Sequence, residues 1–185
     1  MFLQEGVTKP DSDCTYSEHD GHGYFFCRNA SSWTSARDKC RAAGVNMQLV
    51  RVNDDAENAF VEGGLASNAW LGGNDKTTEG AWHWAEGTAD TGIQFWQGKG
   101  TSQGGGAIGG LYSAWLGTTE PDDAGGADCA WTDVAGNWFD TVCTVTNQYV
   151  CEGATVASTP VTVASGGGLH SASIARGGRS ATARS

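Results

Sequence analysis

The stretch Ala69-Trp70-Leu71-Gly72 separates two kinds of pattern in this 185-residue sequence. Before it, residues 32–43 carry apolar side chains on one face at helical spacing, and Asp54 followed by Glu57 resembles the capping box that starts a second helix. After it, helical periodicity gives way to short aromatic and apolar pieces such as Ala81-Trp82-His83-Trp84, with tryptophan at alternate positions. Two helices followed by strands predict an α+β fold.

Composition divides the chain into an acidic body and a different tail. Eleven Lys and Arg residues against 21 Asp and Glu residues give a formal charge of −10, which disfavours binding to nucleic acid or to an anionic membrane surface. Residues 154–185 contain no acidic and no aromatic residue, so we expect a flexible tail there. We predict a leader over residues 1–12, one domain over residues 13–153 and a low-complexity tail over residues 154–185.

The six cysteines favour a disulfide framework over a metal knuckle. They form an even set without close CxxC pairing, as is typical of secreted proteins, and their spacing alone leaves several pairings open. We therefore expect a secreted protein or one at the extracellular surface, with its signal peptide absent from this chain. No apolar run approaches the ~20 residues of a membrane span, so membrane insertion is not expected.

The strongest indication of fold comes from several short motifs in a particular order. They are Trp33 to Cys40, Glu57-Asn58, Trp70-Leu71-Gly72-Gly73, Glu79-Gly80-Ala81-Trp82-His83-Trp84, Glu120-Pro121-Asp122, Gly136-Asn137-Trp138-Phe139-Asp140 and Tyr149-Val150-Cys151-Glu152. With these motifs the chain resembles the long, three-disulfide form of the C-type lectin family. The resemblance implies two helices flanking small antiparallel sheets, with a long irregular calcium-binding loop region. It also implies the disulfides Cys14–Cys27, Cys40–Cys151 and Cys129–Cys143.

The same resemblance implies two neighbouring calcium sites. Calcium is held by six to eight oxygens, for which carboxylates from separate loops are suited. At the auxiliary site the chain has acids at every family position, namely Asp75, Glu79, Asp123 and Asp128. At the principal, sugar-contacting site it has Glu120, Asp122 and Asp140 as metal and ligand contacts. Ala127 and Phe139 stand where the family pattern expects oxygen ligands, so the principal site is degraded or rebuilt.

The resemblance favours a calcium-dependent carbohydrate-binding module whose partner is a glycan or glycoconjugate. The alternative is a calcium-stabilised domain that binds a protein ligand without sugar recognition, which Ala127 and Phe139 favour. A flat ice-binding or mineral-binding surface is a weaker third reading. Ionised Glu120 and Asp122 only accept hydrogen bonds, so specificity for mannose or galactose stays open. A cis bond before Pro121 is also implied.

Catalysis is not expected, because nothing in the sequence resembles a nucleophile with its base. Four tryptophans, Trp70, Trp82, Trp84 and Trp138, are expected in the core, where each large ring can offset a body rich in loops. The run from His19 to His22 has a spacing that could contact a metal, but a turn is the simpler interpretation.

Overall fold

Helix α1 (Trp33–Ala43) begins after Ser32, whose hydroxyl accepts a hydrogen bond from the backbone N–H of Ser35 at 3.3 Å. In the computed structural model, which describes residues 6–155, one face of this helix is buried. A Cβ on Gly44 would lie 2.9 Å from Val7, so glycine permits the close approach at the end of the helix. The predicted helix and its end are confirmed.

Helix α2 (Asp55–Gly64) has the predicted cap. The Asp54 carboxylate accepts a hydrogen bond from the backbone N–H of Glu57 at 2.9 Å. In return, Glu57 accepts one from the N–H of Asn53 at 2.7 Å, one residue earlier than in a capping box. Neither helix within residues 6–155 has the length and apolar character needed to cross a membrane.

Within residues 6–155, ten strands pair into one connected, mixed sheet. They are β1 (Thr15–His19), β2 (His22–Ser31), β3 (Gln48–Leu49), β4 (Ala69–Asn74), β5 (Ala81–Trp84), β6 (Gln94–Gln97), β7 (Gly106–Ala107), β8 (Cys129–Thr132), β9 (Trp138–Thr141) and β10 (Asn147–Ala154). The main order is β1-β2-β10-β4-β5-β6-β7, while β3 pairs with β10, and β8 pairs with both β4 and β9. The pairing is antiparallel, as expected, except that β10 lies parallel to β4 because the last strand enters between β2 and β4.

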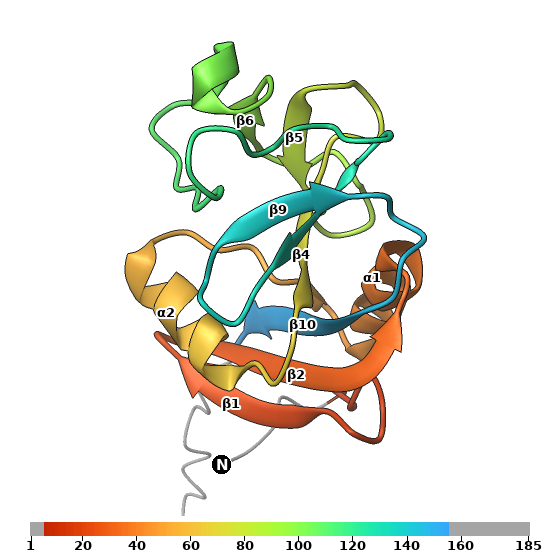
Figure 1. Cartoon of the computed structure of the whole chain (residues 1–185). Helices are drawn as coiled ribbons and strands as arrows, with labels where there is room; N and C mark the ends of the chain where they lie inside the picture. Colours follow the sequence, from red (N-terminus) through yellow and green to blue (C-terminus); the bar gives the residue numbers. More distant parts are fainter. Residues whose placement is uncertain (1–5, 156–185) are drawn as a thin grey trace, which may run out of the picture.

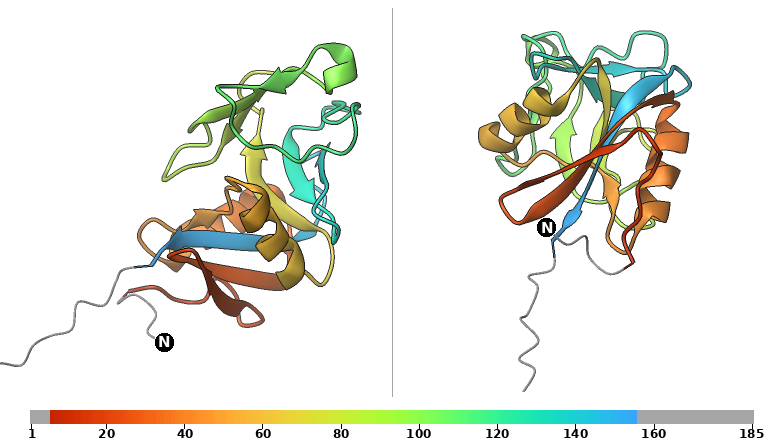
Figure 2. Two further views of the ribbon diagram at one scale, coloured as in Figure 1. Left: turned by 90° about the vertical axis from the view of Figure 1, so that its left-hand side faces the viewer. Right: turned by 90° about the horizontal axis from the view of Figure 1, so that it is seen from below.

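The sheet joins a base to a loop region at the opposite end (Figure 1). The base contains β1, β2 and β10 with the two helices beside them, whereas β5 and β6 belong to the loop region. Both ends of the described chain lie at the base (Figure 2). There Thr8 donates a backbone hydrogen bond to Ala43, and Thr155 donates one to Gly21.

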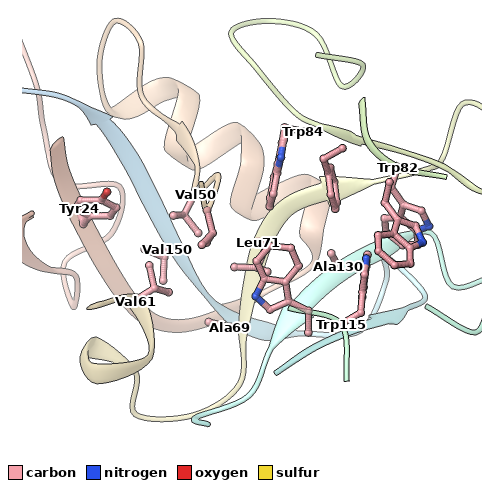
Figure 3. Close-up of a cluster of buried hydrophobic side chains, with 14 of the residues drawn as sticks. Tyr24, Val50, Val61, Ala69, Leu71, Trp82, Trp84, Trp115, Ala130 and Val150 are labelled. Atoms are coloured by element: carbon pink, nitrogen blue, oxygen red, sulfur yellow. The ribbon is translucent and has the colours of Figure 1, made fainter. Parts of the chain in front are cut away.

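Two buried clusters fill the molecule. One connects α2 and the base to the loop region through Val150, Leu71 and a group of tryptophans (Figure 3). Trp82 and Trp84 alternate with half-buried neighbours along β5, and Trp84 stacks on Phe95 with ring centroids 4.4 Å apart. Trp70, Trp82, Trp84 and Trp138 are each at most 2% exposed, so their predicted place in the core is confirmed.

The other cluster contains the disulfide framework. The bonds are Cys14–Cys27, Cys40–Cys151 and Cys129–Cys143, as the resemblance implied. The second bond joins α1 to β10 across 111 positions of sequence. Reduction of this bond would therefore remove the covalent link between the first helix and the last strand.

The apolar segment 47–52 pairs as a strand only over β3, because Val50 instead bonds to Val150 and to Gly72. The glycine-rich segment 98–105 forms a short 3₁₀ helix, η1 (Thr101–Gln103), and leads into the two-residue strand β7.

The boundaries of the leader and the tail differ from expectation. Of the leader, residues 6–12 pack against the domain, and Asp11 accepts a hydrogen bond from Tyr149 at 2.6 Å. Of the tail, Ala154 ends β10, and residues 156–185 lie outside the described residues.

Candidate metal centre

Asp75 directly follows β4 and begins the turn that leads to β5. Its Oδ2 accepts a hydrogen bond from the N–H of Gly80 at 2.8 Å, and its own N–H donates to the carbonyl of Asp128 at 3.2 Å. The residue is 3% exposed, and its Oδ1 has no hydrogen-bond partner within residues 6–155. Burial, together with the negative charges of Glu79, Asp128 and Asp140, raises the pKa of Asp75 to about 7. A nearby positive charge would therefore favour the ionised form of Asp75.

Glu120, Asp122 and Asp140 lie together in the loop region. Each offers a carboxylate oxygen, and these oxygens all lie within 4.8 Å of one another. The peptide bond between Glu120 and Pro121 is cis, as the resemblance implied. Burial, hydrogen bonding to Asp140 and the charges of Asp140 and Asp122 raise the pKa of Glu120 to about 7. These three crowded carboxylates form a set of hard oxygen ligands of the kind that calcium prefers.

Asp140 also organises the loop that follows Pro121. From β9, its Oδ1 and Oδ2 accept hydrogen bonds from the backbone N–H groups of Asp122 at 3.2 Å and Asp123 at 2.7 Å. Asp123 has a φ of +56°, and the Asp122 carboxylate accepts from the N–H of Ala124 at 2.8 Å. One carboxylate therefore positions two of the other predicted ligands through their backbone.

The seven predicted ligands are not all brought together. Within the described residues, Glu120, Asp122 and Asp140 form the compact group, whereas Asp75, Glu79, Asp123 and Asp128 do not form one of this size. Glu79 and Asp128 act on Asp75 through their charge, and Glu79 is exposed. The auxiliary set, which has an acid at every family position in the sequence, is therefore the one whose carboxylates lie further apart in the structure.

Two positions that lack a side-chain oxygen have clear places in the structure. Ala127 is 2% exposed, directly before Asp128. Phe139 pairs with Trp131 across β8 and β9, and their rings stack with centroids 4.4 Å apart. Side chains alternate between the faces of a strand, so Phe139 lies on the face opposite to that of Asp140. This position therefore provides aromatic packing and no side-chain oxygen.

Lys99, at the start of the glycine-rich segment, is a site residue that motif spacing did not indicate. Its ammonium Nζ lies 3.3 Å from Oδ2 of Asp123 and donates a hydrogen bond to the carbonyl of Asp122 at 3.2 Å. A lysine between two glycines carries no sequence signal for such a contact. The contact arises because the glycine-rich segment folds back onto the loop after Pro121.

A second group of possible ligands, His22, Glu57 and Glu152, lies at the base beside a cavity of about 380 Å³. Tyr24 and the N–H of Asn53 donate to the two oxygens of Glu57 at 2.6 and 2.7 Å. Glu152 accepts from His22 and from the N–H of Arg51. Burial raises the pKa of Glu152. These bonds join β2, α2 and β10, and His22 ends the tight β1–β2 turn that was predicted.

Comparison with known proteins gives the identity of the domain. Residues 29–153 match the family described as "Lectin C-type domain". The chain belongs to this family. This C-type lectin domain is 34% identical over 143 residues to human "C-type lectin domain family 10 member A", covering 73% of the chain and 38% of that protein. It is 31% identical to "Asialoglycoprotein receptor 1" of Rattus norvegicus, covering 73% of the chain and 42% of the receptor.

Solved structures show the same fold. The mouse scavenger receptor C-type lectin carbohydrate-recognition domain matches with a TM-score of 0.59 and 22% identity, covering 76% of this chain and 95% of that one. The carbohydrate-recognition domain of cow CD23 matches with a TM-score of 0.58 and 23% identity, covering 82% and 99%. The α+β C-type lectin-like fold and its three-disulfide form are thereby confirmed.

Membership of this family of binding domains also confirms that the domain is not an enzyme. The chain spans about two fifths of the length of the curated relatives that it matches. It is a disulfide-rich lectin domain similar to receptor proteins.

Proposed function

We propose that this C-type lectin domain is a calcium-dependent carbohydrate-binding module, secreted or displayed at the extracellular surface. The observation that carries the proposal is the group of Glu120, Asp122 and Asp140, at motif positions where family members have metal and sugar ligands. The relatives add support for the ligand class. One is an asialoglycoprotein receptor, and the cow CD23 domain was solved in the presence of the oligosaccharide GlcNAc2Man3.

The side chains present suit calcium. Carboxylate oxygens dominate the loop region, and the buried Oδ1 of Asp75 has no hydrogen-bond partner within residues 6–155. Glu120, Asp122 and Asp140 would hold the principal ion, and Asp75, Glu79, Asp123 and Asp128 an auxiliary one. A bound calcium would supply positive charge and open coordination positions for two neighbouring sugar hydroxyls. Exposed Asp122 and half-buried Glu120 would accept hydrogen bonds from the same hydroxyls.

A second candidate is a calcium-stabilised domain that binds a protein ligand without sugar recognition. Ala127 and Phe139 favour it, because two positions of the principal site lack a side-chain oxygen. Under this alternative the acidic loops would be ordered by the ion, but the ligand would contact other side chains of the loop region.

Thermal unfolding of the oxidised protein in millimolar calcium and in EDTA tests the metal dependence. Binding to the folded state alone must raise its stability, so calcium should raise the melting temperature. Asp140→Asn should lose most of this rise, whereas Asp38→Asn, an exposed acid on α1, should keep it. Identical wild-type curves in calcium and EDTA would refute the calcium site.

A glycan array probed in calcium and in EDTA separates the two candidates. Signals that vanish in EDTA and in Asp140→Asn would support carbohydrate binding. Silence on the array together with calcium-dependent stability would instead favour the protein ligand.

A further inference from the structure

The glycine-rich segment 98–105 connects the two halves of the acidic loop region. The N–H of Gly98 donates to the carbonyl of Gly80 at 2.7 Å, and Gly80 in turn donates to the Asp75 carboxylate. The N–H of Gly100 donates to the carbonyl of Pro121 at 2.9 Å, next to Glu120. Lys99 lies between these two contacts, so its backbone is held from both sides.

The backbone of this segment has little conformational freedom, because it packs closely against residues 118 and 119. A Cβ on Gly100 would lie 2.3 Å from the carbonyl oxygen of Thr118, a distance that only glycine tolerates. The N–H and the hydroxyl of Ser102 both donate to that same carbonyl, at 2.9 and 2.7 Å. The indole N–H of Trp96 donates to the carbonyl of Lys99 at 3.2 Å. The backbone of Lys99 is therefore held in place beside the acidic loop, and this limits the positions that its side chain can reach.

The ammonium of Lys99 contacts two oxygens of kinds that calcium also uses, a carboxylate and a backbone carbonyl. Within residues 6–155, this is the only ion pair that involves any of the seven predicted metal ligands. Lys99 is thus the one cation in the described residues that pairs with these seven carboxylates, and its side chain is half-exposed. Removing its charge would increase the repulsion among the carboxylates around Asp123 when calcium is absent.

We propose that Lys99 is a tethered competitor of calcium. Its ammonium neutralises the edge of the site formed by Asp122 and Asp123 in the calcium-free protein, and it must leave Asp123 when calcium binds there. Lys99 thereby lowers calcium affinity and keeps the calcium-free loops folded. This inference rests on the proposed calcium site, and it assigns Lys99 the role of setting the affinity of that site.

The test compares wild type with Lys99→Met, which keeps most of the side-chain length and removes the charge. The control is Lys39→Met, because Lys39 forms a similarly half-exposed pair with Asp11 at 2.8 Å on the far side of the domain. Calcium affinity is measured by isothermal titration calorimetry, and melting temperature is measured in EDTA. Lys99→Met should bind calcium up to about fivefold more tightly, because an exposed ion pair of this kind is weak. It should also melt about 2–4 °C lower in EDTA. Lys39→Met should lower the melting temperature without changing calcium affinity.

The outcomes separate this inference from the proposed function. If wild type binds no calcium but Lys99→Met does, the calcium-dependent function fails for the natural chain and the competitor role stands. If Lys99→Met melts lower but binds calcium no more tightly than wild type, Lys99 forms an ordinary surface ion pair and the inference is wrong. Unchanged affinity and unchanged melting overturn it as well, whether or not wild type binds calcium.

Discussion

The buried carboxyl of Asp75 should contribute less to the stability of the calcium-free protein at neutral than at acid pH. Burial and the neighbouring acids raise the pKa of this group from 3.8 to about 7 in the folded protein. Because the folded pKa is raised, the contribution of Asp75 to stability is full below its ordinary pKa and is lost as the pH rises through about 7. Asparagine cannot ionise, so Asp75→Asn should remove that loss.

The size of the effect follows from the two pKa values. Their difference corresponds to up to about 4 kcal/mol of folding free energy. In EDTA, Asp75→Asn should match wild type at about pH 4 and exceed its free energy of unfolding by up to about 4 kcal/mol at about pH 8. Urea denaturation at several pH values measures this, and taking the difference between variant and wild type cancels the titration of all other groups.

Asp133→Asn is the matched control with the opposite sign. Burial acts to raise the pKa of Asp133, but hydrogen bonds from Asn137 and Ala135 outweigh it and lower the pKa. Its contribution to stability is present above the ordinary pKa, so Asp133→Asn should be less stable than wild type at neutral pH. An Asp75→Asn protein that follows the wild-type pH dependence, or is less stable than wild type at about pH 8 in EDTA, would refute the reasoning.

Three further results are expected. Calcium should raise the melting temperature more at about pH 8 than at about pH 5.5, because Asp75, with its pKa raised to about 7, must lose its proton before it can bind the ion; equal rises would contradict this. Replacing both cysteines of the Cys40–Cys151 disulfide by alanine should cost about 5 kcal/mol in urea denaturation. The same change at Cys129–Cys143, whose separation is 14, should cost about 3 kcal/mol, and the reverse order would exclude loop closure as the cause. Trp84→Ala should cost about 3–5 kcal/mol, since the ring is 2% exposed, and a loss below about 1 kcal/mol would show that the core adjusts around the gap.

The helices and most core strands could be predicted because their signals are local. Ser32 and Asp54 cap the two helices with their own side chains, and the alternation of Trp82 and Trp84 fixes which face of β5 is buried. The disulfide pairing was implied by the family resemblance alone. The parallel pairing of β10 with β4 carried no local signal, because it depends on where the last strand enters the sheet.

The candidate site was predictable as a set of acids, but its arrangement was not. The sequence favours the auxiliary set, which is complete, whereas the compact group in the structure is Glu120, Asp122 and Asp140. That group depends on Asp140 reaching across from β9 to the backbone of the loop after Pro121. The contact between Lys99 and Asp123 could not be predicted for a similar reason, because it depends on the path of the glycine-rich segment.

The position of residues 6 and 155, where the described chain begins and ends, has a practical consequence for how this domain can be studied. Both ends of the described chain lie at the base, and the acidic loops lie at the opposite end (Figures 1 and 2). A biotin attached next to residue 6 or residue 155 would hold the protein on a sensor chip with these loops facing the flowing sample. Several copies attached side by side would present their loops in one direction, which suits multivalent ligands whose separate contacts are weak.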